Sequence, residues 1–134
     1  MADILHGHCL CGALSYQCRG KPLAVTYCHC RACQLASGAP VYLGALYPRE
    51  AVSWQGATTA YRSSPLGLRH FCPVCGSTLF YECTDGSGQL EITVPTLEHP
   101  EALPAECHEW TRSAIPGFDI ADALPRHPEG APGL

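Results

Sequence analysis

The chain has 134 residues, with 12 acidic side chains, eight basic ones and a formal net charge of −4 at neutral pH. One domain accounts for this length, since domains most often have about 100 to 150 residues. The basic residues are scattered, and the sequence has neither an apolar run of the roughly 20 residues that a membrane span needs nor the layout of a signal peptide. We therefore expect a cytoplasmic protein that binds neither nucleic acid nor membranes.

Short extended segments separated by turns make up most of the sequence. The chain contains 13 glycines and 12 prolines, and both residue types favour turns over long helices. Leu90, Ile92 and Val94 alternate with polar residues, as is typical of a half-buried strand. In chain order, the expected strands are Leu14–Cys18, Leu23–Tyr27, Val41–Leu46, Thr58–Arg62, Leu68–Phe71, Thr78–Glu82 and Leu90–Val94. We therefore predict a mainly β fold.

Two segments have helical character, and both are short. Arg31–Ser37 is expected to form one or two helical turns, and Pro100–Leu103 is expected to form another. The C-terminal part of the chain is rich in glycine and proline and shows little periodicity. We expect a small single domain over residues 1–127 and a flexible tail over residues 128–134.

Ten cysteines are unusual in a chain expected in a reducing compartment, so metal binding is the first explanation to consider. Cys9 and Cys11 are two apart in an extended segment, and their side chains therefore point to the same face. Cys72 and Cys75 enclose two residues, so that a tight turn, with Gly76 free to adopt a positive φ, brings both sulfurs to one ion. Together the two pairs offer the four thiolates of a structural zinc site.

A third cluster offers three more sulfurs. Cys28 and Cys30 lie on one face of an expected strand end, and Cys33 lies one helical turn beyond Cys30. Three protein ligands leave one position of a tetrahedral zinc ion open, as in catalytic zinc sites. His29 points to the opposite face in extended backbone and is not expected to be a ligand.

Three alternatives remain open from spacing alone. The three-cysteine cluster is a second structural site if a distant residue completes it. The candidates for that residue are His6, His8, His70, Cys18, Cys83, Cys107 and His108. The cluster could instead hold redox-active thiols. Finally, Cys30 and Cys33 could pair with Cys72 and Cys75 in one ribbon-like site that has a CxxC motif at each end.

Four motifs follow one another along the chain. They are GHCLCGALSY at 7–16, YCHCRACQLASGAP at 27–40, YRSS at 61–64 and FCPVCGSTLFYE at 71–82. Their order and content resemble the glutathione-dependent formaldehyde-activating enzyme family, which also includes centromere protein V. The resemblance implies a tent-like fold of small sheets around zinc, with two zinc ions per chain. The implied ligands of a structural zinc are Cys9, Cys11, Cys72 and Cys75. The implied ligands of a catalytic zinc are Cys28, Cys30 and Cys33.

The resemblance also implies an enzyme that adds a thiol to formaldehyde to give S-(hydroxymethyl)glutathione, or that runs this reaction in reverse. A zinc ion held by three thiolates is a weak Lewis acid, and it suits thiol exchange and polarisation of a small aldehyde oxygen better than water activation. We therefore expect a carbon–sulfur lyase that acts on a small-molecule thiol–aldehyde adduct. The alternative is a zinc-stabilised binding or structural module without catalytic activity.

Residues near the clusters suggest how such a substrate is handled. Histidine titrates near neutral pH and suits proton transfer. The candidate proton carriers are His29, His70, Tyr27 and Glu82. Arginine forms bidentate hydrogen bonds with carboxylates. The candidates for binding the carboxylates of a glutathione-like substrate are Arg31, Arg62 and Arg69. The other cysteines have the character of small buried hydrophobic residues.

Overall fold

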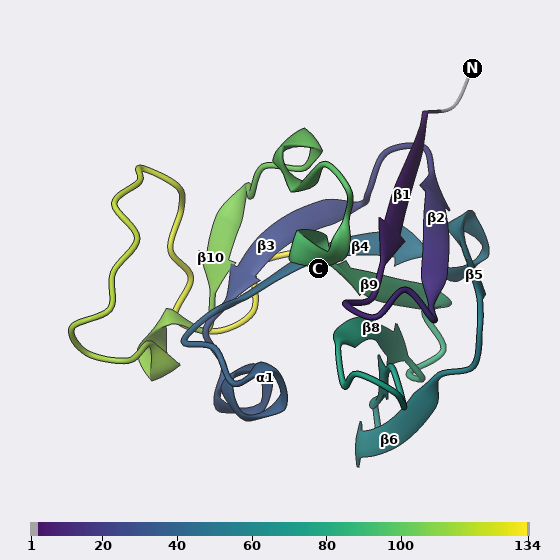
Figure 1. Ribbon diagram of the computed structural model, residues 1–134. Coiled ribbons are helices and arrows are strands. Elements are labelled where there is room, and N and C mark those ends of the chain that lie inside the picture. The colour runs from purple at the N-terminus through teal and green to yellow at the C-terminus, as the bar shows by residue number, and fades with distance from the viewer. Residues whose placement is uncertain (1–2, 134) are drawn as a thin grey trace.

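The computed structural model describes residues 3–133, which form two β-sheets and one α-helix (Figure 1). The strands are β1 (Ile4–His8), β2 (Ser15–Arg19), β3 (Ala24–Cys28), β4 (Tyr42–Pro48), β5 (Val52–Gln55), β6 (Thr59–Ser64), β7 (Gly67–Phe71), β8 (Thr78–Cys83), β9 (Gln89–Thr93) and β10 (Cys107–Glu109). The helix is α1 (Arg31–Ser37), and the 3-10 turns are η1 (Arg49–Ala51), η2 (Val94–Thr96), η3 (Pro100–Ala102) and η4 (Thr111–Ser113). The fold is mainly β, as the sequence predicts.

The larger sheet has seven strands in the order β10-β3-β4-β9-β8-β7-β6, and the smaller sheet has three in the order β1-β2-β5. Neighbouring strands run antiparallel except for β10, which pairs with β3 in parallel. Figure 1 shows β1 and β2 standing nearly upright beside the ends of β4 and β9, and α1 below β3. The larger sheet is therefore flanked by the smaller sheet at one end and by the helix near the other.

The alternation of side chains along each strand gives the larger sheet a core face. Ala45 on β4 and Phe80 on β8 both pair with Ile92 on β9, and all three are buried. The ring of Tyr16, from the smaller sheet, packs edge-on against Phe80 with centroids 5.1 Å apart. Burying a side chain of this size contributes about 1.5–3 kcal/mol. The intervening residues of the same strands project from the opposite face of the larger sheet.

The ends of α1 are fixed by local hydrogen bonds. Cys30 is the N-cap residue, and its sulfur accepts a hydrogen bond from the backbone N–H of Cys33 at 3.3 Å. Gly38 ends the helix in the left-handed conformation, with φ of 68°, and its N–H donates to the Gln34 carbonyl. The buried Gln34 amide donates to the His29 carbonyl at 2.9 Å. This bond ties the helix to the end of β3.

The expected strands are all present, with boundaries within two residues of those expected, and α1 has the expected bounds. The helical turn expected at Pro100–Leu103 is the 3-10 turn η3. The strands β1, β5 and β10 were not expected. Each lies at the edge of a sheet, where a short segment is held by its partner strand rather than by an alternating pattern of its own.

The C-terminal segment leaves the β10 edge of the larger sheet, forms a wide loop and returns (Figure 1). The N–H of Trp110 donates to the Glu129 carbonyl, and the buried Ala131 donates its N–H to the Glu109 carboxylate at 2.7 Å. Glu129 and Ala131 belong to the expected flexible tail. Residue 134 of that tail, and residues 1 and 2 of the expected domain, lie outside the described residues. Within residues 3–133, no helix is both long and apolar enough to cross a membrane.

Candidate metal centres

Four sulfurs from two distant segments meet at one point. Cys9 and Cys11 follow β1, whereas Cys72 and Cys75 lie in the turn between β7 and β8. The Sγ atoms of Cys9 and Cys11 are 3.6 Å apart, those of Cys11 and Cys72 are 3.8 Å apart, and the ligand atoms of the four residues lie within 4.8 Å of one another. Gly76 has a φ of 80° and closes the turn by donating its N–H to the Cys72 carbonyl.

The spacing of these sulfurs fits a tetrahedral zinc site. With Zn–S bonds of about 2.3 Å, the corners of the tetrahedron are about 3.8 Å apart. The backbone N–H of Leu14 donates to the Cys9 sulfur at 3.3 Å, which stabilises a thiolate there. Hydrogen bonding from Ser77 lowers the pKa of Cys75 to about 5. Four soft sulfur donors at these distances suit zinc better than a hard cation such as Mg²⁺.

Three further sulfurs meet where β3 leads into α1. Cys28 ends β3, Cys30 caps the helix and Cys33 lies in its first turn, and the three sulfurs lie within 4.8 Å of one another. Hydrogen bonding from the thiols of Cys28 and Cys33 lowers the pKa of Cys30, so this sulfur is the first of the three to become a thiolate. The donor set is the one that zinc prefers, with one ligand fewer than a closed structural site.

Within residues 3–133, no fourth Cys, His, Asp or Glu side chain converges with the sulfurs of Cys28, Cys30 and Cys33. Of the distant candidates, His70 bonds to a glutamate and His108 bonds to an aspartate. The two CxxC motifs belong to different clusters, so the structure does not contain the ribbon-like pairing. All ten cysteines are free of disulfide bonds.

His29 does not join the sulfurs but begins a buried chain of hydrogen bonds. Its Nε2 lies 2.9 Å from His108 Nδ1, and His108 Nε2 lies 2.9 Å from Asp122 Oδ2. Because an ionised carboxylate only accepts, His108 carries its proton on Nε2 and accepts from His29 Nε2–H. His29 Nδ1 is then an acceptor, and it has no partner among the described residues. Burial lowers the pKa of His29 and keeps its ring neutral. These hydrogen bonds hold His29, and because His29 lies between Cys28 and Cys30, they also hold the backbone that carries both cysteines.

A cavity of about 220 Å³ lies over the three sulfurs, on the face of the larger sheet that points away from the core. Its walls are Cys28, Cys30, Cys33, Tyr42, Arg69, Tyr81, Glu91, Glu109 and Trp110. Residues paired across adjacent strands project to the same side, so Arg69, Tyr81 and Glu91 form one row across β7, β8 and β9. A second row places Glu109 beside Cys28. The sulfurs therefore share the cavity with two carboxyl groups and a guanidinium.

Glu91 occupies a hollow that glycine creates. A Cβ atom on Gly44, on the neighbouring strand β4, would collide with Glu91 Oε1 and with the ring of Tyr42. Burial and the Glu109 carboxylate raise the pKa of Glu91 to about 7. Its carboxyl can therefore both give and take a proton near neutral pH.

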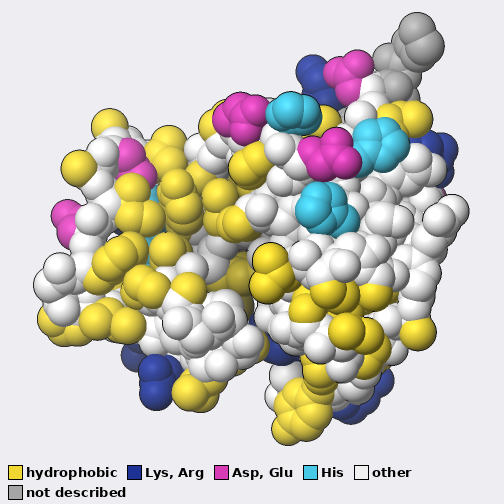
Figure 2. Space-filling view, in the orientation of Figure 1, with side chains coloured by type: hydrophobic (Ala, Val, Ile, Leu, Met, Phe, Trp, Pro, Cys, Tyr) yellow, Lys and Arg dark blue, Asp and Glu magenta, His cyan; other side chains and the backbone are white. Residues whose placement is uncertain are grey.

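A second cavity, of about 370 Å³, continues the first between α1 and the β6 end of the larger sheet. The two cavities share Cys30, Arg69, Tyr81 and Trp110, and Arg31 joins the second. Figure 2 shows a notch in the surface between α1 and β6, with basic side chains beside it. Because Arg31 and Arg69 line this second cavity, we call it the arginine groove.

Arg69 is held in place by two contacts. Its Nε donates to Ser63 Oγ at 3.1 Å, and its guanidinium carbon lies 4.9 Å from the centre of the Tyr81 ring. Neither contact uses the two terminal nitrogens, which are the donors that grip a carboxylate. The side chain is therefore oriented before any anion binds.

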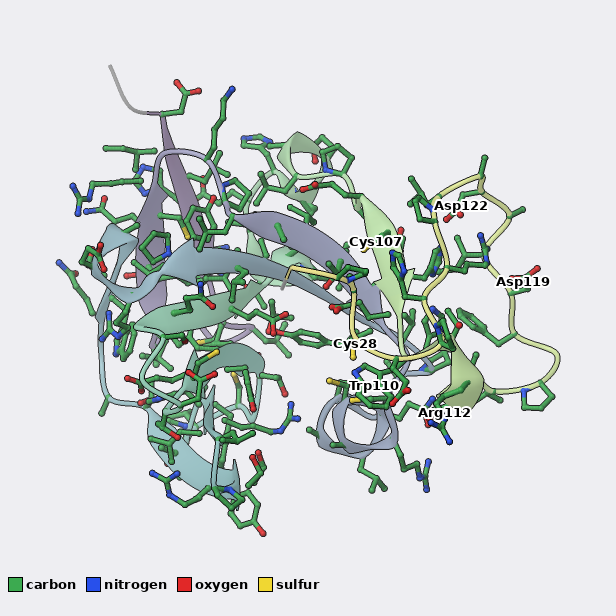
Figure 3. All side chains as sticks on the ribbon, turned by 180° about the vertical axis from the view of Figure 1, so that it is seen from behind. Cys28, Cys107, Trp110, Arg112, Asp119 and Asp122 are labelled. Atoms are coloured by element: carbon green, nitrogen blue, oxygen red, sulfur yellow. The ribbon has the colours of Figure 1, made fainter. Side chains whose placement is uncertain are left out.

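Trp110 forms a wall of both cavities and lies beside Cys28, above α1 (Figure 3). Within residues 3–133 it is the only non-glycine residue with a positive φ, of 57°. Such a conformation costs about 1–3 kcal/mol, and it persists where the surroundings hold it. The backbone bond from Trp110 to Glu129, together with one from Ser113 to Trp110, supplies that support. The C-terminal segment thus helps to fix the shape of the site.

Comparison with known proteins identifies the family. The model of the glutathione-dependent formaldehyde-activating enzymes matches residues 4–113. The chain belongs to this family. The matched region contains both cysteine clusters, whereas the segment that supplies Asp122 and Glu129 to the surroundings of the three-cysteine cluster lies beyond it.

One curated protein and one solved structure are similar to this family member. A Schizosaccharomyces pombe protein named as an uncharacterized lyase is 30% identical over 80 residues, which are 60% of this chain and 58% of the relative. The chain thus spans less than two thirds of that relative's length. A crystal structure of a Rhodobacter sphaeroides protein matches with a TM-score of 0.58 at 18% identity, covering 90% of this chain and 98% of that one. At this identity the likeness concerns the fold alone.

The residues suggested as proton carriers lie outside the cavity over the three sulfurs. His29 belongs to the buried chain, Tyr27 stacks on His108, and His70 bonds to Thr58 and Glu82. Glu91 and Glu109, which line the cavity, were not suggested. Glu91 has the pattern of a solvent-facing position in a half-buried strand, and only the pairing of β9 with β4 and β8 shows that it faces a cavity.

Of the suggested arginines, the structure brings Arg31 and Arg69 together at the arginine groove. Arg62 is exposed and donates to Thr84 and to backbone carbonyls instead. The remaining cysteines lie outside both clusters, and two of them, Cys18 and Cys107, are buried, as a small hydrophobic residue would be.

Proposed function

We propose that the chain is a zinc-dependent carbon–sulfur lyase that forms or cleaves the hemithioacetal of a thiol and a small aldehyde, such as S-(hydroxymethyl)glutathione. Membership of the family supports this function. The observation that carries it is the three-sulfur cluster, which has no fourth protein ligand within residues 3–133 and opens onto a cavity. Zinc bound there would supply a soft Lewis acid that accepts a thiolate and polarises an aldehyde oxygen.

The proposal assigns different tasks to the two clusters. The ligands of the structural zinc are Cys9, Cys11, Cys72 and Cys75. The ligands of the catalytic zinc are Cys28, Cys30 and Cys33. Each chain then holds two zinc ions, and a cytoplasmic location suits both sites because thiols stay reduced there.

The arginine groove favours a thiol that carries carboxylates. Arg69 is oriented by Ser63 and Tyr81 with its terminal nitrogens free of these contacts, and Arg31 lies across the same groove. A thiol whose sulfur lies at the three-cysteine cluster can place a carboxylate against these guanidinium groups, because the two cavities are continuous at Cys30 and Arg69. Glutathione has this combination of a thiol and carboxylates.

Exchange NMR on mixtures of glutathione and formaldehyde tests the activity. The zinc-loaded protein is expected to speed the interconversion of free and adduct forms beyond the uncatalysed rate, and Cys30→Ser is expected to abolish the gain. Cys83→Ser, which alters a half-buried cysteine outside both clusters, serves as the matched control. If the wild-type protein gives no acceleration with glutathione or with other thiols and aldehydes, the chain is a non-catalytic zinc module instead.

A further inference from the structure

Hemithioacetal chemistry moves a proton to and from the adduct hydroxyl, so a proton carrier must reach the cavity over the three sulfurs. We propose that Glu91 is this catalytic residue, and that its carboxyl group exchanges the hydroxyl proton of the adduct while the carbon–sulfur bond forms or breaks. This inference rests on the proposed function and adds a residue to it.

The other titratable groups in the walls of the cavity are less suited to carry a proton. The three cysteines are the proposed zinc ligands, and an arginine stays charged at all working pH values. Burial raises the pKa of Tyr42 and Tyr81, so both phenols hold their protons at neutral pH. The Tyr42 hydroxyl is also engaged with Thr93, at 3.0 Å.

The two carboxyl groups in the walls differ in their contacts. Glu109 accepts a hydrogen bond from the Ala131 N–H at 2.7 Å, and this bond anchors the C-terminal segment. Glu91 lies in the hollow above Gly44, beside Tyr42 and in the same row as Tyr81. A side chain at position 44 would fill the space that the Glu91 carboxyl needs. The fold therefore keeps a place for this carboxyl at the wall of the cavity.

The charges around Glu91 suit reversible proton transfer. Glu109 on β10, Arg69 on β7 and Cys30 at the start of α1 face the same cavity, and the buried site and Glu109 together favour the protonated form while Arg69 opposes them. A carboxyl whose pKa is about 7 is present in both protonation states at neutral pH, which is the condition for efficient general acid–base catalysis.

The step balances as follows in the direction of cleavage. The Glu91 carboxylate takes the hydroxyl proton of the adduct, and the O–H electron pair becomes the second bond of the aldehyde carbonyl. The carbon–sulfur bond breaks, and its electron pair leaves with the sulfur as a thiolate. The products are the aldehyde, the thiolate and protonated Glu91, which then returns its proton to solvent. The formation of the adduct is the reverse of this step.

The test compares Glu91→Gln and Glu91→Asp with the wild-type protein, all loaded with zinc and checked for equal metal content. The rate of exchange between glutathione, formaldehyde and their adduct is measured by NMR from pH 5 to 9. Glu91→Gln is expected to lower kcat by about 10²–10⁴-fold and to remove the dependence on pH near 7, whereas Glu91→Asp keeps part of the rate and a pH-dependent profile. Glu101→Gln, on the exposed turn η3, is the control with the same chemical change.

A second readout does not depend on turnover. In protein labelled with ¹³C at the glutamate carboxyl carbons, one resonance is expected to titrate near pH 7 and to be missing from Glu91→Gln. A wild-type rate and pH profile in Glu91→Gln, or the absence of such a resonance, would overturn the role of Glu91 while leaving the proposed function in place. A wild-type protein without any acceleration would overturn both.

Discussion

Glu91 shows how a single residue that serves chemistry can weaken the fold. Burial and Glu109 raise the pKa of its carboxyl from the ordinary 4.5 to about 7. Between pH 4.5 and about pH 7 Glu91 loses its proton in the unfolded chain but keeps it in the folded protein. The free energy of unfolding therefore falls as the pH rises through this range. Glu91→Gln removes this cost, and we expect its free energy of unfolding to exceed that of the wild type by about 1–3 kcal/mol at pH 8.

Urea unfolding at pH 5 and pH 8 measures this difference. The gain in the free energy of unfolding is expected to be much smaller at pH 5, because a fraction of the unfolded molecules still has Glu91 protonated at that pH. Glu101→Gln, at a largely exposed position, should match the wild type at both pH values. A Glu91→Gln variant that is less stable than the wild type at pH 8 contradicts the assignment of a half-buried carboxyl that holds its proton.

Asp122 is the residue that fixes the buried histidine chain from outside. Its side chain is 21% exposed and accepts from His108, whereas Asp119 on the same loop is 86% exposed (Figure 3). Asp122→Ala leaves the buried His108 N–H without a partner, and we expect it to lower the free energy of unfolding by about 1–3 kcal/mol. Asp119→Ala should lower it by less than about 0.5 kcal/mol. Equal effects of the two substitutions in urea unfolding would mean that the hydrogen bonds from His29 through His108 to Asp122 do not stabilise the fold.

Arg69 carries the proposed selectivity for thiols with carboxylates. Hydrogen bonds to charged groups contribute about 1.5–3 kcal/mol, so Arg69→Gln is expected to raise the KM for glutathione by about 10–100-fold. The KM for 2-mercaptoethanol, which has no carboxylate, should stay the same. Steady-state kinetics with both thiols separates the two outcomes, and a parallel rise in both KM values would show that Arg69 supports the site without binding the carboxylate.

At the scale of elements, the sequence encodes local features better than long-range ones. The strand β9 was predictable because Leu90 and Ile92 alternate with polar residues, and the three-cysteine cluster was predictable because its members lie within residues 28–33. Spacing alone did not decide which distant cysteine pairs meet in the four-sulfur cluster. The edge strands were not predictable, since their partners hold them. The position of Glu91 in the cavity wall was not predictable either, because the register of β9 with β8 and β4 decides which side chains Glu91 lies beside.

Gly44, on β4, lies where the strands around the cavity pack closely against Glu91 and Tyr42. Gly44 has no room for a side chain beside Glu91 and Tyr42. We expect Gly44→Ala to destabilise the protein by about 1–3 kcal/mol, which is the usual penalty for overpacking, and to displace the Glu91 carboxyl. In Gly130→Ala the new Cβ would lie 3.8 Å from Glu109, an ordinary contact, so thermal unfolding of this control should resemble the wild type. An unchanged Tm in Gly44→Ala would contradict the close packing.

At the scale of the whole molecule, the two clusters hold the chain in different ways. The four-sulfur cluster joins the segment after β1 to the turn between β7 and β8, and so links the two sheets across about half of the chain. A metal ion there contributes directly to the free energy of folding. The three-sulfur cluster joins only residues 28–33, at one strand end and one helix start. Its loss removes a local contact and leaves the sheets connected.

The zinc content of two cysteine variants, measured together with their thermal unfolding, tests this division most directly. The wild-type protein should hold two zinc ions per chain. Cys30→Ser should hold one and still unfold cooperatively near the wild-type Tm, whereas Cys75→Ser should lose cooperative unfolding. A Cys30→Ser protein that unfolds, or that keeps both ions, would contradict the account, since the cluster would then be structural or would not hold zinc through Cys30.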